Sequence, residues 1–420
     1  MLDQLIPEFG NIYVILQILS FLLFIGMFLF FPKIMIWQVN RKLRDTMIDL
    51  ESYKQTTEDL FLNKLTDTRT DALDTKFESM KDFKVSAPSN IDPAGAVEKL
   101  EHVLDTSEHK FDRFINKYAD TENENELANL NMTFKGVMGT NQIYRVVRHF
   151  KEMINKTGNI QIISMVQMML PIYKELAESQ KDATRAFADA APIGDSIGPL
   201  VAARLIEEEP EEISEDIVHS EEEIEGQEVH VLKSNGPGAR LGKYGDAIDQ
   251  LADEKDLEAI ITVDAASKFE GETTGDVAEG VGVMMGGPGV EKTKIEEAAT
   301  EHDVPLEGVV IKQSAPEASK AMKKEIYNSH EEAELKAKEL AGEFDGPVAV
   351  VGVGNTVGIP NTRDEASTAH NKLHKYWEEY EEEDEDEVSY MGIMGIMPGG
   401  DQQAGKVQNL KNQVLWTFMR

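Results

Sequence analysis

The sequence feature that most constrains this chain is a long apolar stretch near its N-terminus, over residues 12–36. Only Gln17, Ser20 and Lys33 interrupt its apolar character. The hydrocarbon core of a bilayer is about 30 Å thick and needs roughly 20 mostly apolar residues in a helix. The stretch therefore predicts one transmembrane helix within a membrane anchor over residues 1–36, with the lipid bilayer as a partner.

The charges on either side of this stretch predict its orientation. Residues 1–11 carry Asp3 and Glu8 but no lysine or arginine, whereas Lys33 and residues 41–44 bring positive charge to the far side. Positive loops stay in the cytoplasm, so we expect a single-pass protein of the plasma membrane with a short N-terminus outside and the bulk of the chain cytoplasmic. A cleaved signal peptide would need a basic first region and a small-residue cleavage site, which this sequence lacks.

Composition excludes several kinds of function. The sequence has no cysteine, which rules out disulfides, thiolate metal sites and a cysteine nucleophile. Its formal net charge is −35, from 77 acidic and 42 basic residues, so nucleic acid is not an expected partner. Acid is concentrated at 207–225, which we interpret as an acidic loop, and at 378–387. The rest is spread along the chain as solvated surface, as in proteins from a salt-rich cytoplasm.

The segment over residues 37–189 has the pattern of a helical stalk and bundle. Apolar residues recur there at spacings of three and four between charged residues. The last expected helix, over 160–188, begins with the apolar run IQIISMVQMML, which is too short to span a membrane. It fits either a buried helix or a subunit interface. Because isolated helices of this kind gain most of their stability from packing, we expect a homo-oligomer.

The segment over residues 190–420 has a different pattern, in which short β-branched runs alternate with helical segments. The expected strands are 228–233, 258–264, 308–313 and 347–354, and the expected helices are 242–253, 290–301 and 315–342. Continuous apolar strands separated by helices indicate a parallel sheet covered on both faces. We therefore predict an α/β domain, a three-layer α/β/α arrangement with a mostly parallel sheet, whose ligand crevice lies beyond the carboxyl ends of the strands.

One glycine-rich loop, SNGPGARLGKYG over residues 234–245, follows an expected strand and opens a helix. Backbone N–H groups at a helix N-terminus bind anions, which makes Gly236, Gly238, Arg240 and Lys243 candidate anion-binding residues. The loop has neither the Walker spacing nor the dinucleotide-binding spacing. The alternative is that its glycines only supply the positive φ angles of tight turns.

Two aspartates are the candidate catalytic residues. Asp195 lies between Gly194 and a turn that opens a helix, and Asp264 ends the strand AIITV. A carboxylate at the carboxyl end of a central strand is suited to general acid–base work or to a metal ion. Either aspartate could instead cap a helix or a turn. The loops expected beside them contain Gly286, Gly287, Gly289, Gly352, Gly354 and Asn355. The histidines show no zinc-binding spacing.

The whole chain, from the apolar stretch to GVGNTVGIPN, resembles an archaeal membrane-protein family defined as domain of unknown function 1512. Residues 190–360 also resemble the germination-protease and hydrogenase-maturation-protease fold. GDSIGPLVAARL, IITVDAAS, GVMMGGPG and PVAVVGVGNTVG carry this second resemblance in content and order. It implies an α/β/α sandwich in which acids of a D-x-x-G-P turn and a V-D-A turn are catalytic, matching Asp195 and Asp264.

The second resemblance also has departures. In the maturation proteases a histidine helps acids of comparable turns to bind nickel, but the GVGVMMGGPG segment here contains no histidine. The residues before Asp195 read as helix rather than as a glycine-rich strand end.

Functions of different classes follow from these patterns. The first is a membrane-anchored, hydrolase- or peptidase-like protein that uses Asp195 and Asp264 as acid and base or to hold a divalent metal ion. The second is a non-enzymatic oligomeric membrane scaffold, and the third a module that senses a small anion at residues 234–245.

Overall fold

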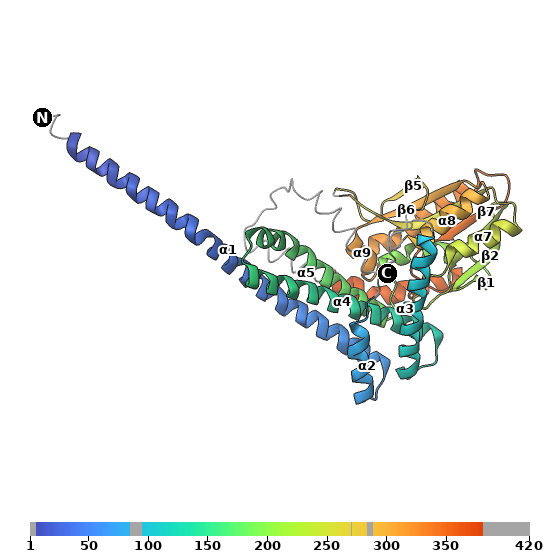
Figure 1. Ribbon diagram of the computed structural model, residues 1–420. Coiled ribbons are helices and arrows are strands. Elements are labelled where there is room, and N and C mark those ends of the chain that lie inside the picture. The colour runs from blue at the N-terminus through green and yellow to red at the C-terminus, as the bar shows by residue number, and fades with distance from the viewer. Residues whose placement is uncertain (1–5, 85–94, 270, 284–288, 381–420) are drawn as a thin grey trace. The chain divides into compact units, whose positions relative to one another are not determined.

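A computed structural model describes residues 6–84, 95–269, 271–283 and 289–380 (Figure 1). The predicted acidic run at 378–387 lies outside these residues from position 381 onward. The chain forms two compact units, one of residues 1–53 and 142–177 and the other of residues 54–141 and 178–420. The N-terminal helices are α1 (Ile6–Leu65), α2 (Asp71–Lys81), α3 (Ala96–Tyr118), α4 (Glu124–Thr157) and α5 (Ile160–Ala188).

The first unit consists of parts of α1, α4 and α5. Each part buries apolar residues at spacings of three, four or seven, which places them on one side of its helix. These residues are Val39, Leu43, Leu50, Ile143, Val147, Ile154, Ile163, Val166 and Leu170. Met165 and Met168 are 42% and 60% exposed, so the apolar run of α5 is only partly covered in the single chain. Self-association through this run stays a prediction.

The predicted transmembrane helix, and with it the single-pass plasma-membrane location, is wrong. No helix in the part of the chain that the structure describes combines the length and apolar character required to cross a bilayer. The predicted span is part of α1, which is one helix of 60 residues. Its apolar first part is not set off as a separate span but runs on through Lys33 and Arg41 into a charged segment that buries Val39 and Leu43.

The helical part of the second unit is built around phenylalanine side chains. The end of α1, α2, α3 and the first half of α4 meet at Phe61, Phe77, Phe111, Phe114 and Phe134, all of which are buried. The ring centroids of Phe61 and Phe134 lie 5.1 Å apart, and those of Phe114 and Phe134 lie 5.2 Å apart. Such aromatic contacts add to the stabilisation from apolar burial, so this cluster holds α3 and α4 in place beside the sheet.

The second unit also contains a seven-stranded sheet in the order β1-β2-β3-β7-β4-β6-β5. The strands are β1 (Glu211–Ser214), β2 (Ile217–Ile224), β3 (Gln227–Ser234), β4 (Ala259–Ser267), β5 (Val277–Val281), β6 (Leu306–Gln313) and β7 (Val348–Gly352). The four predicted strands correspond to β3, β4, β6 and β7, and these pair in parallel.

The sheet is mixed, so the prediction of a mostly parallel sheet is wrong. The strands β1 and β2 pair antiparallel at one edge next to β3, and β5 pairs antiparallel with β6 at the other. The segment 207–225, which the sequence analysis interprets as an acidic loop, supplies β1 and β2. Its apolar residues are few, but Ile217 and Val218 are buried. That burial fixes the hairpin while the glutamates point to solvent.

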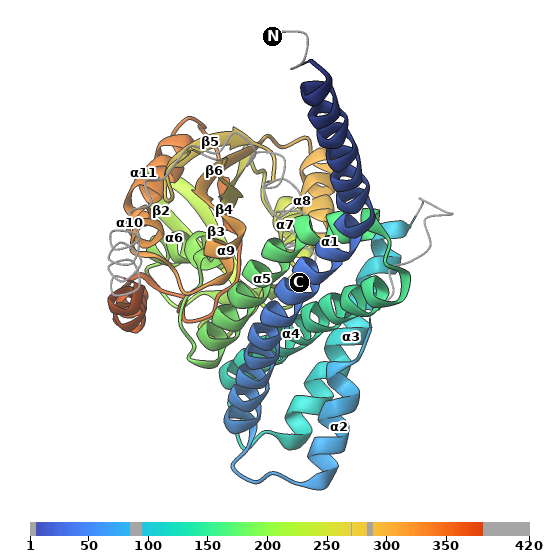
Figure 2. The same ribbon diagram turned by 90° about the vertical axis from the view of Figure 1, so that its left-hand side faces the viewer.

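Helices cover both faces of this sheet (Figure 2). On one face, α6 (Ile197–Leu205) and α11 (His330–Ala341) pack against Val231, Ile261 and Val350. On the other, α7 (Tyr244–Glu254) and α8 (Val290–Glu301) pack against Leu232, Ile260 and Val351. The remaining short helices are η1 (Gly194–Ser196), α9 (Ala315–Ser319), α10 (Lys324–Asn328) and α12 (Arg363–Ala366).

Candidate functional site

Asp195 lies in η1, which is pressed against the carboxyl ends of β4 and β7. At the start of α6, directly after η1, the approach is so close that a side chain at Gly198 would put its Cβ 2.3 Å from the carbonyl oxygens of Val263 and Val353. Only glycine fits such an approach. The D-x-x-G-P turn is thus held against the sheet by backbone contact, which sets where the Asp195 carboxylate lies.

Asp195 and Asp264 each accept a backbone hydrogen bond at this edge of the sheet. Oδ2 of Asp195 accepts the N–H of Asn355 at 3.0 Å, although the two residues are far apart in the chain. Asp264 is only 3% exposed, and its Oδ1 accepts the N–H of Ala265 at 2.6 Å.

Both carboxylates lie close enough to the Tyr244 hydroxyl to influence its ionisation. Tyr244 is fully buried, and its hydroxyl donates to the carbonyl oxygen of Gly352 at 2.8 Å and lies 2.7 Å from Oγ of Ser234. Burial raises the pKa of this hydroxyl, and the negative charges of Asp264 and Asp195 raise the pKa further. The Tyr244 hydroxyl thus joins the ends of β3 and β7, and Tyr244 is not among the residues predicted from the sequence.

Two buried amide side chains adjoin Asp195. Nε2 of Gln313 donates to the carbonyl oxygen of Gly194 at 3.1 Å, and Oδ1 of Asn355 accepts the N–H of Val357 at 2.9 Å. The second polar atom of each, Oε1 of Gln313 and Nδ2 of Asn355, has no hydrogen-bond partner within the described ranges. Buried polar atoms nearly always have partners, so one donor and one acceptor are left for a bound molecule.

We call Asp195, Asp264, Tyr244, Gln313 and Asn355 the carboxyl-end cluster. Gly352 and Gly354, which were expected in the neighbouring loops, do lie beside it. A Cβ on Gly354, whose φ is +137°, would lie 2.0 Å from the carbonyl oxygen of Asp195. Gly289 precedes the first residue of α8 as its N-cap. Gly286 and Gly287 lie outside the described residues.

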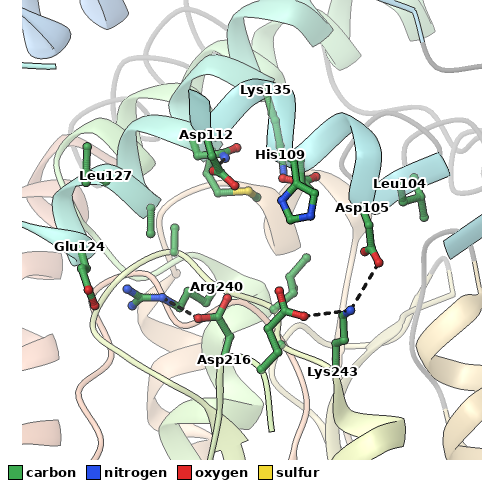
Figure 3. A pocket seen from close by; sticks show the side chains of 18 of the residues that line it. Leu104, Asp105, His109, Asp112, Glu124, Leu127, Lys135, Asp216, Arg240 and Lys243 are labelled. Carbon is green, nitrogen blue, oxygen red and sulfur yellow. Dashed lines mark hydrogen bonds and ion pairs between the residues drawn. The ribbon is translucent and has the colours of Figure 1, made fainter. Parts of the chain in front are cut away.

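The cations predicted to bind an anion are already paired with carboxylates. Nε of Arg240 lies 3.1 Å from Asp216, and Nζ of Lys243 lies 2.9 Å from Glu215 and 3.4 Å from Asp105 (Figure 3). Gly236 and Gly238 serve close backbone packing, because a Cβ on Gly236 would lie 1.8 Å from the carbonyl oxygen of Ile359. The geometry gives no support to an anion at this loop, and anion binding there stays a prediction.

The same loop forms one wall of a pocket of about 600 Å³, whose opposite wall is α3 and the start of α4 (Figure 3). Acidic side chains outnumber basic ones in its lining, which includes Glu101, Asp105, Glu108, Asp112, Glu124, Glu215, Asp216 and Glu291 against Lys135, Arg240 and Lys243. Burial raises the pKa of Asp112, Asp216 and Glu291. The pocket is therefore suited to a ligand that donates hydrogen bonds or carries positive charge.

A buried lysine also lies at this edge of the sheet. Lys233, near the end of β3, is fully buried, and its Nζ donates to Oδ1 of Asn361 at 2.7 Å and to the carbonyl oxygen of Ser234 at 2.8 Å. Burial lowers its pKa to about 7. The sequence does contain a signal for it, since a lysine that ends the apolar run VHVLK cannot face solvent if the strand is central.

The fold and this cluster define a class of protein: a helical N-terminal region followed by a mixed-sheet domain with two aspartates at its strand ends, one half-buried and one buried. Residues 16–190 match the N-terminal domain of the protein of unknown function DUF1512, and residues 193–360 match the C-terminal domain of unknown function of the same family. The chain belongs to the DUF1512 family. Comparisons with curated proteins and with solved structures gave no match.

Proposed function

We propose that the carboxyl-end cluster is the active site of a hydrolase that cleaves peptide bonds. The observation that carries the proposal is that the turn of Asp195 packs directly against the strand ends that hold Asp264, since a Cβ on Gly198 would lie 2.3 Å from the carbonyl oxygens of Val263 and Val353. Two carboxylates in different surroundings are a common means of supplying one acid and one base. The likeness of the D-x-x-G-P and V-D-A turns to the germination and maturation proteases supports a peptide as the substrate.

The surroundings of each carboxylate suggest its role. Asp195, which is half-buried and accepts the N–H of Asn355, would take a proton from the attacking water. Asp264, the more buried of the two, would give a proton to the leaving amine. The Nδ2 group of Asn355 would donate to the oxygen that becomes negative when water adds to the carbonyl carbon. Asp195 gains one proton and Asp264 loses one, so their summed charge does not change. Proton exchange with solvent then returns each carboxyl group to its starting form.

The test compares the full chain with single variants on fluorescein-labelled unfolded casein, with chelator and separately with Mn²⁺ or Mg²⁺. We expect hydrolysis by the wild type and a loss of about 100-fold or more in Asp264→Asn and in Asp195→Asn, the range typical of general acid–base residues. A requirement for Mn²⁺ or Mg²⁺ would assign the pair to metal binding.

The matched control is Asp253→Asn, because the Asp253 side chain is 74% exposed and lies on α7 away from the cluster. It should keep wild-type activity. Thermal unfolding of each variant separates a lost catalytic group from a lost fold. No hydrolysis by the wild type in any of the three conditions, or full activity in Asp264→Asn, would contradict the proposal.

A second candidate function, sensing of a small organic cation, is favoured by one feature of the acidic pocket. Asn131 is 8% exposed and lines the pocket; its Nδ2 donates to Asp112 at 2.6 Å, while its Oδ1 has no partner in the described part of the chain. The buried Oδ1 of Asn131 and the carboxylates beside it would all accept hydrogen bonds from a ligand with N–H groups. Calorimetry should give binding of spermidine but not of inorganic phosphate, and Asp112→Asn should weaken it. Phosphate binding that Lys243→Gln abolishes would instead favour anion sensing.

A further inference from the structure

The β2–β3 hairpin carries four side chains of metal-binding types, two histidines and two glutamates, on one face. Side chains alternate between the two faces of a strand, so His219 and Glu221 of β2 share a face, as do Glu228 and His230 of β3. The register pairs Glu221 directly with His230. His219 and Glu228 each lie two residues from a member of this pair, so all four side chains lie close together. They are on the antiparallel side of the sheet rather than at the carboxyl ends of its parallel strands.

Three of these groups are close enough to share one ion. One ligand atom from each of Glu221, Glu228 and His230 lies within 4.8 Å of the others. The His230 ring is fully buried, whereas the Glu221 and Glu228 side chains are 55% and 44% exposed. The imidazole is therefore fixed, while the carboxylates are free to rotate by the small amount needed to reach metal-bond distances of about 2.0–2.2 Å.

The buried imidazole has the neighbours that a metal-binding histidine needs. Nδ1 of His230 lies 3.0 Å from Nε2 of His219, and Nε2 of His230 lies 3.1 Å from Oε1 of Glu228. Metal-binding histidines donate their other ring N–H to a partner that fixes the ring. If His230 donates from Nδ1 to His219, its Nε2 lone pair points to the carboxylates.

A lysine ammonium group now bridges the two carboxylates. Nζ of Lys255 lies 2.9 Å from Oε2 of Glu221 and 3.4 Å from Oε1 of Glu228. Its side chain is 33% exposed and follows the end of α7, so it can turn into solvent. A divalent ion brings twice the charge and a bond to the imidazole, neither of which the ammonium offers.

We propose that Glu221, Glu228 and His230 form a binding site for a divalent transition-metal ion, with His219 as the positioning residue and the Lys255 ammonium as a competing cation. The ligand set of one imidazole nitrogen and two carboxylates fits Zn²⁺ or Ni²⁺ better than Mg²⁺ or Ca²⁺, which prefer oxygen ligands alone. No residue of the carboxyl-end cluster takes part in this site. The metal-site proposal is therefore independent of the proposed hydrolysis.

The experiment titrates the chelator-stripped full chain with Zn²⁺ against a chromophoric chelator. We expect one site that Glu221→Gln and His230→Gln each weaken by at least tenfold. Lys255→Gln should tighten Zn²⁺ binding, because it removes the competing charge without removing a ligand. Glu221→Gln changes an exposed residue and tests the site even if the buried His230 variant does not fold.

Two controls make the result specific to these residues. Glu222→Gln lies next to Glu221 but on the opposite face of β2, and it should bind Zn²⁺ like the wild type. Asp264→Asn should also leave this site unchanged, which separates it from any metal at the carboxyl-end cluster. Equal Zn²⁺ affinity in wild type and Glu221→Gln, or an affinity in Lys255→Gln that is no tighter than in the wild type, would overturn the proposal.

Discussion

The carboxyl-end cluster and the β2–β3 hairpin belong to the same sheet but hold their carboxylates in opposite ways. In the cluster, Asp195 and Asp264 are held by backbone N–H groups, in a segment packed so closely that Gly198 admits no side chain. On the hairpin, Glu221 and Glu228 are exposed and paired with the Lys255 ammonium. Backbone contacts therefore fix the first two carboxylates, whereas side-chain charge governs the second two.

The largest effect should come from filling the close approach at the start of α6. We expect Gly198→Ala to destabilise the fold by about 3 kcal/mol, because the new Cβ would overlap two carbonyl oxygens and force the backbone apart. The matched hairpin change is Gly226→Ala, where φ is +89° and nothing lies within 4 Å of the new Cβ. It should cost only about 1–2 kcal/mol, from the left-handed conformation alone. Urea unfolding of both variants measures the difference. Equal losses of stability would contradict the view that close backbone packing distinguishes the Asp195 turn from the hairpin.

Lys233 and Lys255 should contribute differently to the pH dependence of stability. Burial lowers the pKa of Lys233 from 10.5 to about 7 in the folded chain. Between these pH values the unfolded chain holds a proton on Lys233 that the folded chain has lost, so unfolding takes up a proton and the free energy of unfolding rises with pH. The slope should approach about 1.4 kcal/mol per pH unit near pH 9.

The measurement for this prediction is urea unfolding from pH 7 to pH 10 in wild type, Lys233→Met and Lys255→Met. Subtracting the variant curve from the wild-type curve isolates one lysine. The Lys233 difference should rise with pH, while ion pairing raises the pKa of Lys255 and leaves no rise over this range. If the difference in unfolding free energy between wild type and Lys233→Met does not change with pH, the pKa of Lys233 is not lowered in the folded chain.

Removing the Tyr244 hydroxyl should have an intermediate effect. In Tyr244→Phe, the carbonyl oxygen of Gly352 and the hydroxyl of Ser234 lose a buried partner. A buried polar group left unsatisfied costs about 1–3 kcal/mol. Thermal and urea unfolding should show this loss, and retention of full stability would mean that the phenol does not join the strand ends.

The smallest effect should come from Lys243. Its ammonium is paired with Glu215 and Asp105 at the mouth of the acidic pocket. Surface ion pairs contribute about 0–1 kcal/mol and are screened by salt. Lys243→Gln should therefore change urea unfolding by less than about 1 kcal/mol, and less still in high salt. A larger loss would show that the ion pairs of Lys243 contribute more to stability than exposed ion pairs such as those of the hairpin.

Much of the sheet could be predicted from the sequence, because each of its four parallel strands is a continuous apolar run such as AIITV. The antiparallel edges could not, since EEISEDIVHSEEEIE has the composition of a solvated loop and becomes a hairpin only through the burial of Ile217 and Val218. The membrane anchor failed for a related reason. The composition of residues 12–36 predicts an anchor, whereas in the structure the same helix continues into charged residues and no described helix has the length and apolar character to cross a bilayer.

For the candidate site, position along the strands was enough to propose Asp195 and Asp264. Tyr244 could not be found in this way, because it begins a helix and reaches the strand ends only through tertiary packing. Likewise, Arg240 and Lys243 have the sequence context of an anion site, but their carboxylate partners come from distant segments: Asp105 is in α3, and Glu215 and Asp216 are in the β1–β2 turn. Spacing along a chain does not reveal such neutralisation.

The place of β7 in the sheet has a consequence for synthesis of the chain. The strand is the last of the seven to be made, yet it lies between β3 and β4, which do not pair with each other. Until it emerges from the ribosome, the nascent domain consists of two half-sheets, each with an open edge, and open edges invite pairing with other chains. A chain that stops before residue 348 would leave both edges permanently uncovered.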